Sequence, residues 1–166
     1  MHTLTVSMAT RLHSTGKHKP YFIRKADLRR LRALALEAQR RGQQEVCGML
    51  ARTRFRELEL WFLTNQCSNA GSFRIERTEY LRARRQIREL GKYPIGTFHS
   101  HPISEATPAK SDLTGVALNS LCLIYDVCGR TARLWKIVKR QHRRYANEIP
   151  FASVPERNHL SRTRKQ

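Results

Sequence analysis

Acidic residues are scarce in this chain of 166 residues. Thirteen aspartates and glutamates stand against 32 lysines and arginines, which gives a formal net charge of +19. No apolar run approaches the roughly 18 residues that a membrane-spanning helix needs, and the first eleven residues lack the long apolar core of a secretory signal. We therefore expect a soluble, cytoplasmic protein that makes no contact with a membrane.

Cysteines are few, and none of them are paired as Cys-x-x-Cys. The four are Cys47, Cys67, Cys122 and Cys128. This spacing argues against a cysteine-type zinc site. Without a secretory signal, free thiols in a reducing compartment are favoured over disulfides.

The length is that of a single domain. By composition the chain divides into a basic, flexible N-terminal segment at 1–19, a folded domain at 20–140 and a basic C-terminal extension at 141–166. Basic ends are usually solvated tails. The alternative is an electrostatic arm for an acidic partner or a phosphate backbone.

Hydrophobic periodicity predicts nine elements in the order β-α-β-β-α-β-α-β-β. The expected strands are 21–23, 46–50, 58–62, 94–98, 121–125 and 132–138, and the expected helices are about 28–41, 77–90 and 109–118. Few of these strands are long enough to stand alone. We therefore expect an α/β protein with a single mixed β-sheet sandwiched by helices.

The residues that carry chemistry follow the predicted strand 94–98. His99 and His101 are two positions apart, so on an extended segment both imidazoles point to the same side. Asp112 follows after a loop, where a carboxylate can complete a three-ligand set. Two histidines and one carboxylate, with a fourth position left for water, form the pattern of a catalytic zinc site. Taken alone, histidine pairs are common on surfaces, and Asp112 also suits a helix's first turn.

The combined motif resembles the JAMM, or MPN-plus, metallopeptidases, and in particular the small single-domain prokaryotic JAB type. That family has a glutamate upstream, then His-x-His-Pro, six further residues and Ser-x-x-Asp. His99-Ser100-His101-Pro102 and Asp112 fit this spacing, and Glu45-Val46-Cys47-Gly48-Met49-Leu50 matches the family's Glu-x-x-Gly-x-Leu strand. The resemblance spans about residues 20–140. It implies the JAB/MPN architecture, which is similar to that of cytidine deaminases.

The resemblance also implies a mechanism. Zn²⁺ would be the cofactor, with His99, His101 and Asp112 as its ligands, and Glu45 would be the catalytic base that takes a proton from the zinc-activated water. The bond attacked would be the peptide or isopeptide bond after the C-terminal glycine of a ubiquitin-like or sulfur-carrier protein, in deconjugation or precursor processing. Conjugation proteins encoded in the same operon would be further partners. Taken without the motif, Glu45 is equally consistent with a solvated position on a strand.

Ala109 departs from the family pattern, because it stands where the family has a serine that supports the oxyanion. Loss of one oxyanion donor lowers a rate by about 10²–10³. Three accounts remain open: the enzyme is slow, the alanine is a deliberate substitution, or another donor takes over. Such a donor would be Ser104, a backbone N–H or Ser111, although Ser111 at a helix start points elsewhere.

Three functions are therefore ranked. The first is the zinc-dependent hydrolase, and the alternative is a weakly catalytic zinc-binding module that holds ubiquitin-like proteins. A basic nucleic-acid-binding protein ranks third, because no basic strand with interleaved aromatics and no helix-turn-helix pattern supports it. The nearest candidate is Phe73-Arg74, which core packing explains equally well.

Overall fold

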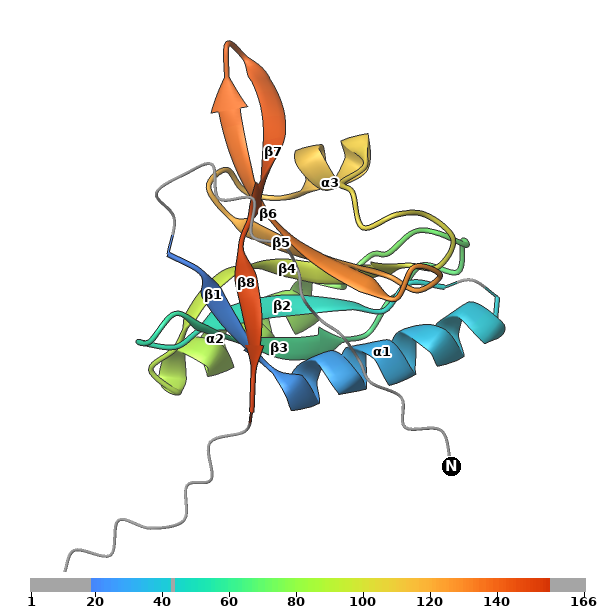
Figure 1. Cartoon of the computed structure of the whole chain (residues 1–166), viewed down its shortest axis with the longest axis horizontal. Helices are drawn as coiled ribbons and strands as arrows, with labels where there is room; N and C mark the ends of the chain where they lie inside the picture. Colours follow the sequence, from blue (N-terminus) through green and yellow to red (C-terminus); the bar gives the residue numbers. More distant parts are fainter. Residues whose placement is uncertain (1–18, 43, 156–166) are drawn as a thin grey trace, which may run out of the picture.

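The computed structural model describes residues 19–42 and 44–155. Eight strands form one mixed sheet in the order β7-β6-β5-β4-β2-β3-β1-β8, with three helices around it (Figure 1). The strands are β1 (Tyr21–Arg24), β2 (Cys47–Arg52), β3 (Glu57–Leu63), β4 (Tyr93–His101), β5 (Leu121–Asp126), β6 (Thr131–Arg140), β7 (Arg143–Ile149) and β8 (Phe151–Val154), and the helices are α1 (Lys25–Arg40), α2 (Arg77–Glu89) and α3 (Lys110–Gly115). None of these three helices has the length and apolar character that crossing a bilayer requires.

The predicted α/β class and the single mixed sheet are confirmed. All nine predicted elements are present in the predicted order. Their bounds differ from the prediction by up to three residues, and two of the differences bear on the site. β4 continues to His101, so both motif histidines belong to the strand itself, and α3 ends at Gly115 instead of near residue 118.

The expected C-terminal boundary at residue 140 is wrong. β7 and β8 lie in the segment assigned to a basic extension, and both belong to the sheet. The sequence pattern does not predict β7, because a regular alternation of apolar residues is lacking in Arg-Arg-Tyr-Ala-Asn-Glu-Ile. The sheet therefore extends to Val154. The remaining residues of that extension, 156–166, and nearly all of the predicted N-terminal segment, 1–18, lie outside the described residues.

The sheet curls until its two outer strands meet. β7 and β8 stand at opposite ends of the strand order, yet only Pro150 separates them along the chain. One residue spans at most about 3.6 Å, so these two edges must be neighbours at this corner. Ile149 and Phe151 on either side of Pro150 both pack into the same core, and the backbone N–H of Tyr21 donates to the Pro150 carbonyl.

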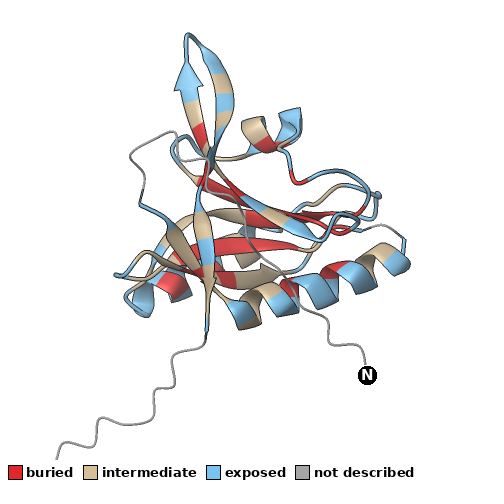
Figure 2. Ribbon diagram, viewed as in Figure 1, coloured by how far each residue is buried: buried red, intermediate tan, exposed pale blue. Residues whose placement is uncertain are grey.

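The helices cover both faces of the sheet. On one face, Leu31 and Ala35 of α1 are fully buried in a cluster with Leu50 of β2 and Phe98 of β4. Burial is concentrated along these central strands (Figure 2). Burial of this apolar surface is the main source of the domain's stability.

α2 and α3 lie on the opposite face. Ala83 and Ile87 of α2 pack against Met49 and Ala51 of β2. Partly buried side chains of α3 pack against Ile124 of β5 in a separate cluster. Since neighbouring side chains along a strand alternate between faces, the residues on either side of Phe98 in β4 point toward α2 and α3.

The glycine of the Glu-x-x-Gly motif is required by packing. Gly48 of β2 is buried, and a Cβ atom there would overlap the Trp61 carbonyl oxygen and the Phe98 ring. Only a residue without a side chain allows β2, β3 and the α1-facing core to approach this closely.

Candidate metal centre

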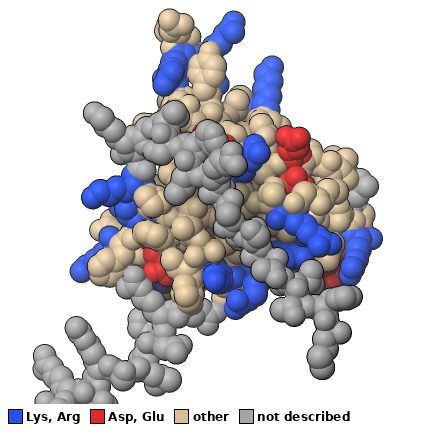
Figure 3. All heavy atoms as spheres, viewed as in Figure 1, with Lys and Arg blue, Asp and Glu red and all other residues tan. Residues whose placement is uncertain are grey.

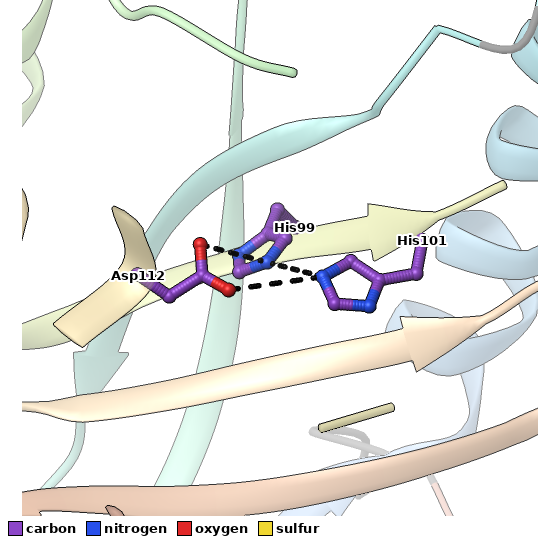
Figure 4. A group of neighbouring side chains, drawn as sticks. All are labelled: His99, His101 and Asp112. Atoms are coloured by element: carbon purple, nitrogen blue, oxygen red, sulfur yellow. Dashed lines mark hydrogen bonds and ion pairs between the residues drawn. The ribbon is translucent and has the colours of Figure 1, made fainter. Parts of the chain in front are cut away.

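His99 and His101 project from the end of β4 toward Asp112 of α3 (Figure 4). His99 Nε2 lies 3.4 Å from Asp112 Oδ1, and His101 Nε2 lies 3.8 Å from Asp112 Oδ2. The two Nε2 atoms are 3.0 Å apart. All three side chains are at least nine-tenths buried. The structure thus brings together the three residues that the sequence predicted as ligands.

This arrangement fits a four-coordinate metal ion. Zinc–ligand bonds of about 2.0–2.1 Å place tetrahedral donor atoms about 3.3–3.4 Å from one another. The observed separations are 3.0 Å between the two Nε2 atoms, 3.4 Å from His99 to Oδ1 and 3.8 Å from His101 to Oδ2. One ligand atom from each residue lies within 4.8 Å of the other two. Two imidazoles and one carboxylate leave a fourth position free, as in catalytic zinc sites and unlike closed structural ones. The three residues therefore form a candidate metal site.

The histidine rings are held from outside the cluster. Nδ1 of His101 lies 2.6 Å from the Glu105 carbonyl oxygen. A carbonyl only accepts, so Nδ1 carries a proton, and the neutral imidazole can then present the Nε2 lone pair to a metal ion. The ring of Phe73 stacks on His99 with 4.8 Å between the ring centres. Nδ1 of His99 points toward the Cys122 thiol, with 3.9 Å between Nδ1 and Sγ.

The carboxylate of Asp112 is held in its ionised form. Burial alone would raise its pKa, but the contacts with His101 and His99 outweigh burial and lower the pKa well below its usual range. The Ala109 backbone N–H adds a hydrogen bond of 2.7 Å to Oδ2. Burial would lower the pKa of His101, but its contacts with Asp112 and Glu105 raise it instead.

Glu45 lies two residues before the start of β2 and is only 6% exposed. The next residue, Val46, is locked to β4 between the two histidines: its carbonyl accepts from the Ser100 N–H, and its N–H donates to Ser100 Oγ, both at 2.9 Å. Burial raises the pKa of Glu45, while His99 and His101 lower it. Glu45 is not one of the three clustered donors, so it lies near the candidate metal site without joining it.

Ala109 precedes α3 and is exposed. Its side chain offers no hydrogen-bond donor, and its backbone N–H already serves Asp112. Ser104 and Ser111 are both exposed, and neither hydroxyl is hydrogen-bonded to the three donors in the described part of the chain. Ala109 itself therefore provides no substitute for the hydroxyl that the family serine would supply.

Asp126 is the second buried aspartate near the site. It lies beside His101 in the register of β4 and β5. Its Oδ1 accepts a hydrogen bond of 2.8 Å from the Gly129 N–H, in the turn after β5. Asp126 thus holds a turn and stays outside the donor cluster.

Asn65 is a residue of the site that the sequence did not reveal. Its Nδ2 donates to the carbonyls of Glu45 and Ser72, at 2.9 and 3.0 Å. Its Oδ1 accepts from the N–H groups of Cys67 and Arg74, at 2.8 and 3.0 Å. One amide thus connects the backbone of Glu45 to the loop that carries the His99-stacking phenylalanine. The sequence indicated only a polar loop here, because nothing local specifies partners 20 residues away.

We expect Asn65→Ala to lower the free energy of unfolding by about 2–3 kcal/mol, because four backbone groups lose a partner in a half-buried place. Asn65→Asp retains the two bonds in which the side chain accepts but places a carboxylate oxygen against the Glu45 and Ser72 carbonyls, so it should also be less stable than the unsubstituted chain. Urea unfolding of both variants measures the difference. Equal stability of Asn65→Ala and the unsubstituted chain would contradict this role.

Two contacts from β6 and β7 support the segment that carries Asp112. Trp135 Nε1 donates to the Ala106 carbonyl at 2.9 Å. Arg144 Nη1 donates to the carbonyls of Leu113 and Val116, at 2.9 and 2.5 Å. Since these last carbonyls of a short helix have no partner within it, Arg144 fixes the end of α3.

The fold and the cluster together define an α/β protein with a buried two-histidine, one-carboxylate site on one face of a curled sheet. The family model for prokaryotic homologs of the JAB domain, Prok-JAB, matches residues 28–149. The chain therefore belongs to this family, and the resemblance found in the sequence is confirmed. The JAB/MPN domain family includes hydrolases, among them metallo-isopeptidases.

Solved structures share the fold at low sequence identity. A solution structure from Desulfitobacterium hafniense is 22% identical with a TM-score of 0.70, and the match covers 84% of this chain and 97% of that chain. A solution structure from Salinibacter ruber is 20% identical with a TM-score of 0.51, covering 78% and 90%. A crystal structure of a JAB1/MPN domain protein from Archaeoglobus fulgidus is 16% identical with a TM-score of 0.48, covering 82% and 99%. A comparison with curated proteins found no match.

Proposed function

We propose that this protein is a zinc-dependent hydrolase that cleaves the peptide or isopeptide bond after the C-terminal glycine of a ubiquitin-like or sulfur-carrier protein. The observation that carries the proposal is the convergence of His99, His101 and Asp112 on one point beside the buried Glu45. Membership of a family that includes metallo-isopeptidases supports the reaction type.

Each residue has a role that its surroundings support. When bound at His99, His101 and Asp112, zinc would lower the pKa of a coordinated water toward about 7 and polarise the scissile carbonyl. Glu45 accepts a proton from the water as its oxygen bonds to the scissile carbonyl carbon, and it then passes this proton to the nitrogen of the leaving amine as the C–N bond breaks. Burial raises the pKa of this carboxyl, which strengthens it as a base relative to an exposed glutamate.

A direct test uses a ubiquitin-like sulfur carrier fused through its C-terminal glycine to a short peptide. The full chain, loaded with one zinc ion, is incubated with the fusion, and the masses of the products are measured by mass spectrometry. We expect cleavage after the glycine with zinc and none after chelation. Zinc-loaded protein that binds the fusion without cutting it would overturn the hydrolase in favour of the binding module.

One observation favours that alternative function, a weakly catalytic zinc-binding module for ubiquitin-like proteins. The exposed Ala109 provides no side-chain donor for an oxyanion, and its N–H is already hydrogen-bonded to Asp112. Zinc binding and recognition of the substrate would persist in such a module, while the chemical step would be slow.

Ala109→Ser separates the two functions. Restoring one oxyanion donor is expected to raise kcat by about 10²–10³ without changing zinc stoichiometry. Ser111→Ala, a neighbouring exposed position, is the control and should leave kcat unchanged. Equal kcat for Ala109→Ser and the unsubstituted chain would show that this position contributes nothing to the chemical step.

A further inference from the structure

β6 and β7 form a hairpin that projects beyond the rest of the sheet (Figure 1). No acidic residue occurs from Thr131 to Asn147, which covers all of β6 and most of β7. Within the same stretch lie six basic residues: Arg133, Lys136, Lys139, Arg140, Arg143 and Arg144. Lys and Arg side chains surround the projecting end in the space-filling view (Figure 3).

Like charges face each other across this hairpin. In the register of β6 and β7, Lys139 lies opposite Arg144, and Arg140 lies opposite Arg143. Cross-strand pairs of like charge destabilise a hairpin. Both faces of the projecting end therefore carry positive charge, and of these four residues Arg144 has a structural role at the end of α3.

The turn of the hairpin also departs from the usual preference. Gln141 and His142 have φ values of 43° and 66°, as in the type I′ turns that favour Asn-Gly. Residues with a Cβ adopt this conformation at a cost. Sequences that depart from the usual preferences for cross-strand pairs and for turn residues at the same place are characteristic of functional surfaces.

The charges at the end of the hairpin are available to a ligand. Lys139, Arg140 and Arg143 are exposed, and none of them forms an ion pair with another described residue. Arg144 differs from these three, because it is occupied with the carbonyls at the end of α3. Arg144 thus anchors the hairpin to α3, whereas the other basic side chains near the turn form no ion pair with the described residues.

The composition of this surface favours a nucleic acid over an acidic protein. Protein interfaces have an apolar core, whereas the hairpin exposes a single large hydrophobic side chain, Tyr145, which is 45% exposed. Interfaces with nucleic acids are polar and strongly positive. An aromatic ring among arginines can also stack on a base.

We propose that the β6–β7 hairpin binds the phosphate backbone of a nucleic acid without sequence preference. This inference is independent of the proposed hydrolase activity. It also revises the ranking drawn from the sequence. The boundary expected at residue 140 separates Lys139 and Arg140 from Arg143 and Tyr145, whereas the structure places all four on one hairpin.

The test compares two variants of the full chain that have the same net charge. One carries Lys139→Gln, Arg140→Gln and Arg143→Gln. The matched control carries Arg77→Gln, Arg82→Gln and Arg88→Gln, at exposed positions of α2. Fluorescence anisotropy with a labelled DNA duplex and a labelled single-stranded RNA, each of about 20 nucleotides per strand, is measured from about 50 to 200 mM salt. The relative affinities for the two probes identify which nucleic acid is preferred.

We expect the hairpin variant to reduce the slope of log K against log salt by about 1 for each lost phosphate contact, hence by about 2–3, and the control to reduce it by less than 1. The Tm of the hairpin variant should be unchanged or higher, because cross-strand repulsion is relieved. Equal losses in the two variants, or no binding to either probe, would overturn the proposal. Preferential displacement of the probe by poly-L-glutamate at equal charge would also overturn it and assign the hairpin to an acidic protein.

Discussion

Replacing Glu45 with glutamine will lower kcat by about 10²–10⁴, the usual contribution of a general base, and leave one zinc ion bound per chain. Glutamine has the same shape but cannot accept a proton at neutral pH. Zinc binding persists because the three clustered donors do not include residue 45. Product formation from the glycine-linked fusion and zinc content by mass spectrometry measure the two effects separately.

Glu105→Gln is the matched control for this prediction. The Glu105 side chain is exposed, and its contribution to the site is the backbone carbonyl that accepts from His101. The substitution keeps that carbonyl, so kcat and zinc content should both be unchanged. Full activity of Glu45→Gln would remove Glu45 from the mechanism, and loss of zinc from it would make Glu45 a ligand instead of a base.

Asp112→Ala will weaken zinc binding by more than about 100-fold. Loss of a residue that only supports a ligand already costs about 10–100-fold in affinity, and Asp112 supplies one of the three donors itself. The variant also leaves two imidazoles without the buried charge that raises the pKa of His101. Competition with a chromogenic zinc chelator measures the change in Kd.

Asp126→Asn controls for the loss of a buried carboxylate in the same part of the fold. Asp126 is 8% exposed and Asp112 is 9% exposed, but Asp126 is hydrogen-bonded to a turn. We expect its zinc affinity to match that of the unsubstituted chain. A larger loss of affinity in Asp126→Asn than in Asp112→Ala would mean that the wrong carboxylate has been assigned.

Local patterns were sufficient to predict the elements that bring the ligands together. Alternation placed His99 and His101 on one side of an extended segment, and the structure has both in β4 pointing to the same site. The position of Asp112 at the start of a helix was also predictable from its neighbours. These features depend on residues within a few positions of one another, which is the range that periodicity can detect.

The supports of the site depend on contacts between distant segments, and no local pattern specifies these. Asn65 reaches back 20 residues to the Glu45 carbonyl. Arg144 reaches α3 from β7, a strand whose charged sequence resembles a tail. Once the sheet curls through Pro150, these side chains lie beside the segments that they hold.

The charge of the chain is distributed in two ways that the composition does not distinguish. Most arginines of α1 and α2 lie on exposed helix faces, where solvation is sufficient to explain them. The basic residues at the end of the β6–β7 hairpin instead oppose one another in pairs. The first arrangement has no functional implication, whereas the second one is the basis for the proposed phosphate contact.

Zinc K-edge X-ray absorption of the loaded full chain tests the central assignment most directly. The account predicts one zinc ion per chain with only nitrogen and oxygen neighbours at about 2.0–2.2 Å, two of them imidazoles. Cys122 lies close to His99, but burial raises the pKa of its thiol to about 12, which disfavours the thiolate that a zinc ligand requires. A sulfur neighbour at about 2.3 Å, or a coordination shell that Asp112→Ala leaves unchanged, would contradict the assignment.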